Sequence, residues 1–214
     1  MLKKLFTRLF GRAAAQPGLT DPAGMPFADS ADTEFDPILP DEEQTEALRQ
    51  FMLAITAHLG VEESERLSEE VIRHFLDPGL SGHDPVPDAD TAVSEGVFGE
   101  DGQSADKPLM IGIDHRAADE IAWQANTLLA THGVEETWHW HATEDETSAM
   151  HAFSDLAGWL ASRNLALLHL DLGGDAYHAF FAKPDKVMFI LRRANDAQLN
   201  VFTHEAFRQR EQGA

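Results

Sequence analysis

The sequence predicts an α+β fold, in which helices pack on a single mixed β-sheet. Short apolar runs of strand length occupy residues 109–113, 165–170 and 176–182. Other segments place apolar residues every three or four positions, which is the spacing of an amphipathic helix. An apolar fraction of 43% is enough to build a core. We therefore expect a single α+β domain over residues 41–209, preceded by two segments of different character.

The first of these segments, residues 1–15, predicts a basic amphipathic helix with four basic side chains and no acidic one. Its apolar positions are Leu2, Leu5, Phe6, Leu9 and Phe10, and its basic positions are Lys3, Lys4, Arg8 and Arg12. Because the cations interrupt the apolar stretch, the segment is unlike a secretory signal. A weak peripheral contact with an anionic membrane through residues 1–12 is one interpretation. Packing on the body of the protein, or no role at all, are the others.

The second segment, residues 16–40, contains five prolines, five acidic residues and no basic residue, which predicts a disordered acidic linker. A helical hairpin follows, with helices expected at 41–59 and 64–76. Asp41 has the character of an N-cap, and Gly60 of a helix stop.

Residues 77–108 predict a disordered acidic insertion within the domain. They hold four prolines, five glycines and eight acidic residues, and few of the apolar residues that a packed loop would use. A loop of this length is unusual in a compact domain, so a mobile lid is the alternative.

From residue 109 onward the pattern alternates between strands and helices. We expect two β-α units, then a three-strand antiparallel meander and a last helix. The expected strands are 109–113, 137–141, 165–170, 176–182 and 187–191, and the expected helices are 117–131, 143–163 and 196–209. Thr143 and Glu146 form a capping-box pattern for the middle helix. Since β-α units favour right-handed parallel crossovers, the sheet is expected to be mixed.

The net charge of −21 arises from 16 basic and 37 acidic residues. Such a surface repels phosphate backbones, so nucleic acid is not an expected partner. High solubility explains the charge, and a protein partner of basic character is the functional alternative. The absence of cysteine excludes disulfides and thiolate zinc sites. No apolar run approaches the ~18 residues of a membrane-spanning helix.

Acidic and imidazole side chains follow the predicted strands. If the first three strands are parallel, their carboxyl ends meet at one edge, where ligands bind in open sheets. The ligand-binding candidates at this edge are Asp114, His115, Asp171, Asp175 and Tyr177. His139 and His141 lie two apart on a predicted strand and so share a face. Together with Asp171 they are the candidate ligands of a divalent metal.

Each of these residues also has a structural interpretation. Asp114 has the position of a helix cap, and Asp171 and Asp175 flank a glycine turn in which aspartate bonds its own backbone. His139 and His141 fit the solvated face of an edge strand. His169 and His178 fall within strands and are expected to be structural.

Two motifs resemble those of an uncharacterised bacterial family of unknown function. The first comprises Ile111 to Arg116 followed by Glu120 to Gln124, and the second runs from Leu170 to Tyr177. The similarity covers about residues 42–209, interrupted by the acidic insertion. The resemblance implies a bacterial cytoplasmic domain with no assigned reaction, and it carries over no catalytic residues.

The function predicted first is a non-enzymatic binding or adaptor domain with a protein partner and no cofactor, because phosphate-loop, nucleophile-elbow and dinucleotide motifs are absent. It is expected in the cytoplasm or at the periphery of the inner membrane. The alternative is a small metal-assisted hydrolase with an Asp/His site at the strand ends. A third hypothesis, an acidic immunity-like or mimic protein, needs the negative side chains to form one ordered face.

Overall fold

The computed structural model describes residues 41–77, 88–141 and 148–213. The predicted basic helix, the predicted linker, and the capping box of Thr143 and Glu146 lie outside these residues. Within the described ranges, no helix combines the length and the apolar character needed to cross a bilayer.

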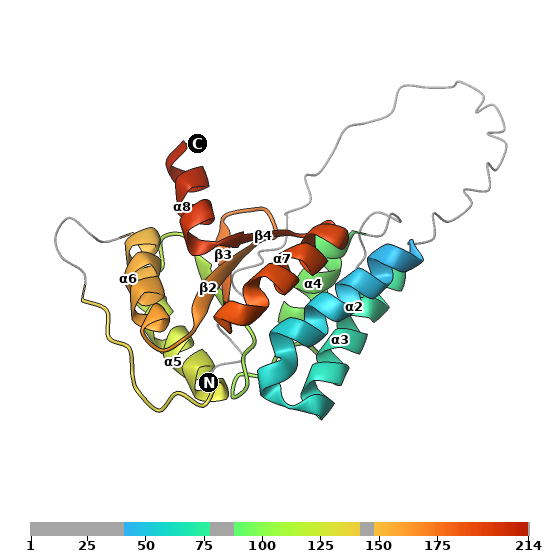
Figure 1. Ribbon diagram of the computed structural model, residues 1–214, viewed down its shortest axis with the longest axis horizontal. Coiled ribbons are helices and arrows are strands. Elements are labelled where there is room, and N and C mark those ends of the chain that lie inside the picture. The colour runs from blue at the N-terminus through green and yellow to red at the C-terminus, as the bar shows by residue number, and fades with distance from the viewer. Residues whose placement is uncertain (1–40, 78–87, 142–147, 214) are drawn as a thin grey trace, which may run out of the picture. The chain divides into compact units, whose positions relative to one another are not determined.

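The α+β class is confirmed, since helices pack on both faces of one four-stranded sheet (Figure 1). The strands are β1 (Ile111–Asp114), β2 (Ala166–Asp171), β3 (Ala176–Ala182) and β4 (Asn200–Thr203). The helices are α2 (Glu42–Thr56), α3 (Val61–Leu76), α4 (Ala89–Phe98), α5 (Ile121–Thr131), α6 (Ala149–Ala161), α7 (Val187–Asp196) and α8 (His204–Gly213). Short 3₁₀ turns occur at Ala57–Leu59, Ala118–Glu120 and Pro184–Lys186.

The sheet has the strand order β1-β3-β2-β4, and every neighbouring pair is antiparallel. The prediction of parallel crossovers in a mixed sheet is therefore wrong. The reason is that β3 inserts between β1 and β2 and pairs with both, with Ile111 opposite Ala179 and Leu170 opposite His178. Because β1 and β2 both run antiparallel to β3, they point in the same direction and end at the same border of the sheet.

Helices cover the sheet in two layers (Figure 1), and the side chains of each strand alternate between the cores under these layers. Leu168 and Leu170 of β2 belong to the core under α2, α3, α4 and α7, which we call the first face. Leu167 belongs to the core under α5 and α6, which, with α8, we call the second face. His169 also lies on this second face, against Phe153 of α6 and Phe207 of α8.

The hairpin of α2 and α3 agrees with its prediction. Asp41 caps α2 by accepting a hydrogen bond from the Glu43 N–H at 3.0 Å. Both helices bury an apolar stripe in the first face, formed by Leu48, Phe51, Met52 and Ile55 of α2 and by Val71, Ile72 and Phe75 of α3. At the contact of the two helices, Thr56 Oγ1 and Ser64 Oγ share a hydrogen bond of 2.6 Å.

Residues 88–108 are not the predicted disordered insertion, because α4 lies within them and is packed into the core. Asp88 caps α4 by accepting a hydrogen bond from the Thr91 N–H at 3.1 Å. The small residues that resemble a loop in the sequence let α4 approach α3. A Cβ added to Gly96 would lie only 2.7 Å from Val71 Cγ2.

The segment 137–141 contains no strand, so this prediction is also wrong. Asn126 of α5 supplies the hydrogen bonds that a neighbouring strand would have made. Its Oδ1 accepts from the Trp138 N–H at 2.7 Å, and its Nδ2 donates to the Trp138 carbonyl at 2.9 Å. The Trp138 side chain is buried.

The predicted strand 187–191 is the first half of α7, and the predicted helix 196–209 is replaced by β4 and α8. Pro184 begins a 3₁₀ turn that leads directly into α7. The buried residues Ile190 and Ala194 then follow helical spacing. The left-handed backbone of Gln198, with φ of 63°, ends this helix and allows the chain to enter β4.

Candidate functional site

Four of the five predicted ligand-binding residues lie along the border of the sheet at which β1 and β2 end. They are Asp114, His115, Asp171 and Asp175. Asp114 ends β1 opposite Ala176, and the next backbone N–H, that of His115, donates to the Asp175 carbonyl at 3.2 Å. Asp171 ends β2 at the other side of the hairpin turn. The predicted convergence holds for these residues because β1 and β2 share a direction, although they are not neighbours.

The side chains of β1's end stabilise the turn that follows the strand. Asp114 Oδ1 accepts a hydrogen bond from the Arg116 N–H at 2.8 Å. His115 Nδ1 lies 3.2 Å from the Asp175 carbonyl oxygen and 3.4 Å from Asp114 Oδ1. Both side chains are partly exposed. The hydrogen bonds that they make to the turn give them a structural role that needs no ligand.

Asp171 and Tyr177 attach α8 to the sheet. Asp171 Oδ1 accepts from the Gly173 N–H at 3.0 Å, and Oδ2 lies 2.9 Å from Arg210 Nη2 in α8. The Tyr177 hydroxyl donates to Glu211 Oε2 at 2.7 Å. Burial, together with this carboxylate, raises the pKa of Tyr177 to about 12. These residues therefore hold a helix in place, and Asp171 has little freedom to bind a metal.

The metal candidates His139 and His141 lie outside the sheet, in the irregular segment after Trp138. No three His, Asp or Glu side chains in the described part of the chain are arranged to bind one metal ion. The predicted set of His139, His141 and Asp171 is therefore not assembled as a metal centre. Its prediction depended on a strand at 137–141 that the fold does not contain.

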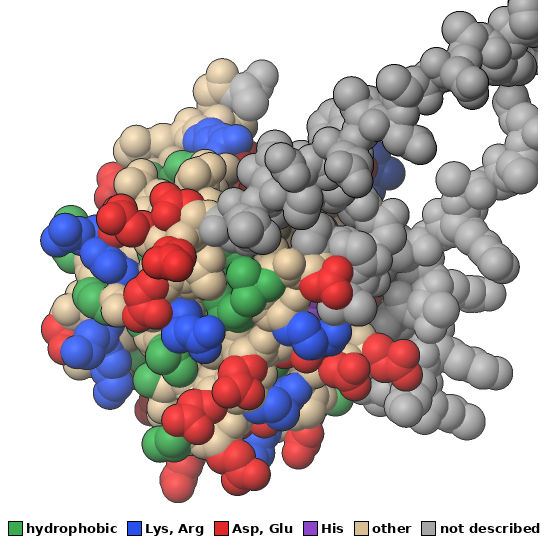
Figure 2. All heavy atoms as spheres, turned by 90° about the vertical axis from the view of Figure 1, so that its right-hand side faces the viewer, with side chains coloured by type: hydrophobic (Ala, Val, Ile, Leu, Met, Phe, Trp, Pro, Cys, Tyr) green, Lys and Arg blue, Asp and Glu red, His purple; other side chains and the backbone are tan. Residues whose placement is uncertain are grey.

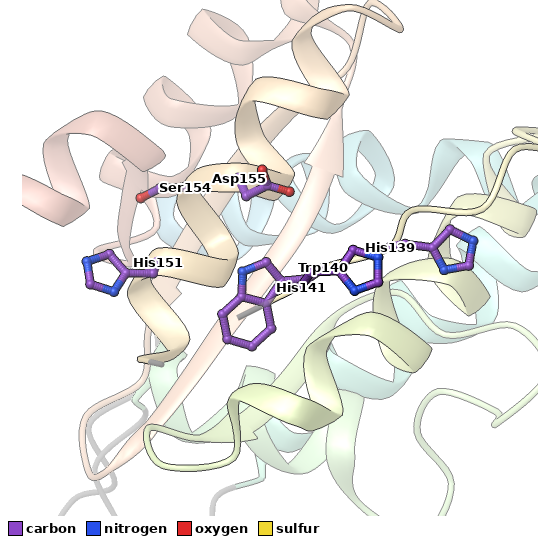
Figure 3. Close-up of a pocket in the computed structure, with 6 residues that line it drawn as sticks. All are labelled: His139, Trp140, His141, His151, Ser154 and Asp155. Atoms are coloured by element: carbon purple, nitrogen blue, oxygen red, sulfur yellow. The ribbon is translucent and has the colours of Figure 1, made fainter. Parts of the chain in front are cut away.

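His139 and His141 instead line a pocket of about 390 Å³. Trp140 lies between them in the chain, and His151, Ser154 and Asp155 of α6 complete the lining. Figure 3 shows His151 at one end of this group and the other two imidazoles at the opposite end, with the indole between them. Trp138 Nε1 donates to Asp155 Oδ2 at 2.8 Å and so ties the segment to α6.

Behind this pocket, Ser154 begins a chain of hydrogen bonds that leads to the sheet. Its Oγ lies 3.1 Å from His204 Nε2, at the start of α8. His204 Nδ1 lies 3.0 Å from Nε2 of His169, which is fully buried in β2. The chain therefore links α6, α8 and β2 through two imidazoles.

Aromatic rings enclose the inner histidine. The His169 ring stacks on Phe207 with centroids 4.4 Å apart, and the Phe153 ring meets it edge-on at 5.1 Å. Burial, with a smaller contribution from His204, lowers the pKa of His169 to about 3. Burial also lowers the pKa of His204. Both imidazoles are thus neutral at pH 7, and each ring carries one N–H and one acceptor nitrogen.

Sequence reasoning missed this chain. Ser154, His169 and His204 come from three separate elements, so no motif spacing connects them. The one available signal was an imidazole in the apolar run from Leu165 to Leu170, since a buried polar group requires a partner.

A different feature stands out on α7. Met188 and Phe189 are 76% and 46% exposed, and they are accompanied by exposed Lys186 and by Arg192, whose side chain is also 76% exposed. We call these four residues the α7 surface. The opposite side of α7 is buried through Ile190 and Ala194, so the helix is firmly seated while this surface faces solvent.

The α7 surface is bordered by α2, which runs beside α7 (Figure 1). Arg193 Nη1 donates to Gln50 Oε1 of α2 at 3.4 Å, and its guanidinium carbon lies 5.8 Å from the centre of the Phe189 ring. Arg193 Nη2 also pairs with Asp196 at 2.9 Å. The position of the Phe189 ring is thus supported by an arginine that is itself held from two sides.

Comparison with protein-family models matches residues 34–205 to a domain of unknown function, DUF6630. No curated protein and no solved structure gave a match. The matched range includes both motifs, at 111–124 and 170–177, that resemble those of a family of unknown function. Since the match covers most of the chain, this protein belongs to the DUF6630 family.

Proposed function

We propose that this chain is a binding domain whose α7 surface docks an acidic amphipathic segment of a partner protein. The observation that carries the proposal is the exposure of Met188 and Phe189 between Lys186 and Arg192. Methionine, aromatic residues and arginine are enriched at protein interfaces, and neighbouring large apolar side chains on a surface mark interaction sites.

Charge supports an acidic occupant. Residues 183–196 contain four basic and two acidic residues, and one of the acids, Asp196, lies 4.0 Å from Arg192 Nε and 2.9 Å from Arg193 Nη2. This segment is still net basic, whereas the whole chain has a net charge of −21. Charge is screened beyond about 8 Å at physiological ionic strength, so a docked segment would experience mainly the local basic field. Carboxylates flanking an apolar helix face would complement this surface.

A second exposed apolar residue provides a matched comparison. Val61 is 75% exposed, nearly as much as Met188, but it begins α3 and is followed by Glu62 and Glu63. An acidic partner segment is repelled at this position. Exposure alone therefore does not define the proposed docking site, and position 61 serves as its control.

The alternatives receive less support. A nucleic-acid mimic needs a continuous acidic field, and on the face shown in Figure 2 the acidic side chains are scattered among Lys, Arg and hydrophobic side chains. No described arrangement favours a metal-assisted hydrolase.

The proposal is tested by site-specific photo-crosslinking in the full chain. A photoreactive amino acid at position 188 should capture a partner from the source cells, and the same group at position 61 should not. The captured protein is then purified and its affinity measured directly. Met188→Asp and Phe189→Asp are expected to weaken binding at least about tenfold, as for interface hot spots. Arg192→Glu should weaken it more at low salt than at high salt.

Val61→Asp is the control and should bind with unchanged affinity. Equal capture at positions 61 and 188 would contradict the proposal. So would a captured protein whose measured affinity is the same for the wild type and for Met188→Asp. All substitutions are at exposed positions, so the melting temperatures should remain close to that of the wild type.

A further inference from the structure

We infer that Ser154 is the nucleophile of an ester-hydrolysing site, with His204 as its general base and His169 as a positioning residue. This inference goes beyond the proposed docking function and does not depend on the α7 surface. It rests on the hydrogen-bonded chain, on the pocket at its outer end, and on the buried imidazole at its inner end.

The distances have the form of an activated serine. A nucleophile and its base must lie within hydrogen-bond reach, and a third group must orient the base. Here Ser154 Oγ is 3.1 Å from His204 Nε2, and His204 Nδ1 is 3.0 Å from His169 Nε2. His204 therefore contacts Ser154 with one ring nitrogen and His169 with the other, as a base that is oriented by a third group must. His169 is the last member of the chain.

The protons in the chain have two consistent arrangements. In one, His169 donates to His204, His204 donates to Ser154, and the Ser154 hydroxyl donates to the Met150 carbonyl at 2.8 Å. In the other, Ser154 donates to His204 and His204 donates to His169. The second arrangement is the reactive one, because it places a free lone pair of the base against the nucleophile's proton.

The inner imidazole leaves both arrangements available. His169 Nδ1 is buried and has no hydrogen-bond partner among the described residues, so no contact fixes which ring nitrogen carries its proton. Burial keeps His169 neutral, as its lowered pKa indicates. A neutral acceptor can receive the Nδ1–H of His204 when that ring becomes a cation, which stabilises the charge formed in the reaction.

The pocket gives the nucleophile access to a substrate. Ser154 is one of the residues that line the cavity of about 390 Å³, with Trp140 and three imidazoles. Figure 3 shows its hydroxyl at the end of the group where His151 lies. The walls combine an indole, three imidazoles and the Asp155 carboxylate, which disfavours an anionic ligand and leaves room for an uncharged ester with a planar group. The volume is that of a small-molecule site. The inferred substrate class is therefore a small neutral ester of an aromatic alcohol.

The chemistry balances with water as the only co-reactant. Ser154 Oγ forms a bond to the acyl carbon while its proton passes to His204 Nε2. The ester C–O bond then breaks, and the leaving alcohol takes that proton. Water next attacks the acyl-serine with His204 again accepting a proton, and the acid is released as Ser154 recovers its hydrogen.

The test uses a fluorophosphonate, which reacts with activated serines. In that reaction a bond forms from Ser154 Oγ to phosphorus, the P–F bond breaks, fluoride leaves, and the hydroxyl proton passes to His204. Peptide mapping of the labelled full chain should find the adduct on Ser154, and Ser154→Ala should abolish it. Ser162→Ala is the matched control, because Ser162 Oγ, at the end of the same helix, donates to the Trp159 carbonyl at 2.7 Å.

Ser148 serves as a comparator within the same molecule. Its Oγ lies 3.2 Å from a single imidazole nitrogen, His151 Nδ1, and no second imidazole supports that contact in the described structure. Labelling at Ser154 should exceed labelling at Ser148 at least about tenfold. An unlabelled Ser154, or equal labelling of both serines, would overturn the inference.

The roles of the two imidazoles are separated by rate and pH. His204→Gln is expected to slow labelling of Ser154 about 100-fold or more, the contribution typical of a general base. His169→Leu should lower the rate of Ser154 labelling and shift the midpoint of the pH profile of that rate. His169→Gln can still hydrogen-bond His204, so its labelling rate and pH midpoint should lie close to those of the wild type. A folded His169→Leu protein with the wild-type rate and pH profile would show that His169 has no positioning role. Labelling of the wild-type chain decides the role of Ser154 even if a histidine variant fails to fold.

Discussion

The two faces of the sheet differ in the side chains that they bury against their helices. On the first face, β2 and β3 present Leu168, Leu170 and Phe180 to helices whose inward stripes are apolar. On the second face, β2 presents His169 at a position where an apolar residue would pack as well. A buried imidazole loses its hydration, and here only one of its nitrogens regains a hydrogen bond. The first face is thus organised for stability, while the second gives up some stability to place a polar group.

The largest expected effect tests whether the first face is the main source of stability. Phe180 is fully buried and meets Phe51 of α2 edge-on, with ring centroids 6.2 Å apart. Phe180→Ala should lower the free energy of unfolding by about 3–5 kcal/mol. Phe207→Ala on the second face should cost at least about 1 kcal/mol less, because Phe207 is the sole buried residue of α8 and lies nearer the surface, at 5% exposure. Urea denaturation of the two variants measures these changes in the free energy of unfolding. Equal decreases for the two variants would contradict the difference in stability between the two faces.

A smaller effect is expected from two glycines in helices on opposite faces. Gly96→Ala would place its Cβ 2.7–2.9 Å from Val71 atoms, two of which belong to the backbone, and should cost about 1–3 kcal/mol. Gly158 of α6 has no atom within 4 Å of an added Cβ. Gly158→Ala should therefore stabilise the protein by about 0.5–1 kcal/mol through its better helix propensity. The melting temperature should fall for Gly96→Ala and rise for Gly158→Ala, and a melting temperature that does not fall for Gly96→Ala would mean that α4 is not tightly packed against α3.

The smallest effect concerns a histidine pair at the boundary between the faces. His58 follows α2, His132 follows α5, and their rings stack with centroids 3.7 Å apart. Burial lowers the pKa of His132 to about 3, with smaller contributions from the charges of His58 and Lys183, and burial lowers that of His58 to about 4. Below pH 6.5 the unfolded chain binds protons that the folded chain does not, so stability falls as the pH decreases.

We expect the free energy of unfolding to decrease between pH 7.5 and pH 5, and His132→Phe to reduce that decrease by about 1–2 kcal/mol. The measurement is a pair of urea titrations at the two pH values. His139→Phe, at an exposed position, is the control and should keep the wild-type decrease. If His132→Phe behaves like this control, the stacked pair does not contribute to acid sensitivity.

Local signals predicted the parts of the fold that depend on neighbouring residues. The helices α2, α3 and α5 have clear apolar stripes, and the strands β2 and β3 are short apolar runs between turn residues. These patterns lie within the elements themselves or a few residues from them, so they can be recognised without knowing any distant contact.

The remaining elements are decided by tertiary contacts. α4 mixes small and polar residues with Val93, Val97 and Phe98, and it is the close approach of α3 that makes Gly96 a packing residue. The run from Val187 to Leu191 fits a strand as well as a helix until its position over α2 is known. The pairing of β1 with β3 joins segments far apart in the chain, and no local pattern encodes it.

The same limit applies to the candidate sites. The border residues Asp114, His115, Asp171 and Asp175 were brought together by assuming that the first three strands are parallel, whereas β1 and β2 share a direction only through their common antiparallel neighbour β3. The pocket and the chain behind it could not, because they depend on how α6 and α8 lie over β2. A buried polar residue such as His169 is where local reasoning is expected to fail, since it serves a contact outside its own element.

Because β4 ends at Thr203 and α8 begins at His204, strand and helix join without any intervening loop. The backbone of His204 at this junction is therefore positioned by α8, which two polar contacts hold at its other end, Arg210 to Asp171 and Tyr177 to Glu211. Cutting the chain within α8 before Arg210 would remove both contacts, and we expect it to loosen the junction and admit water to His169.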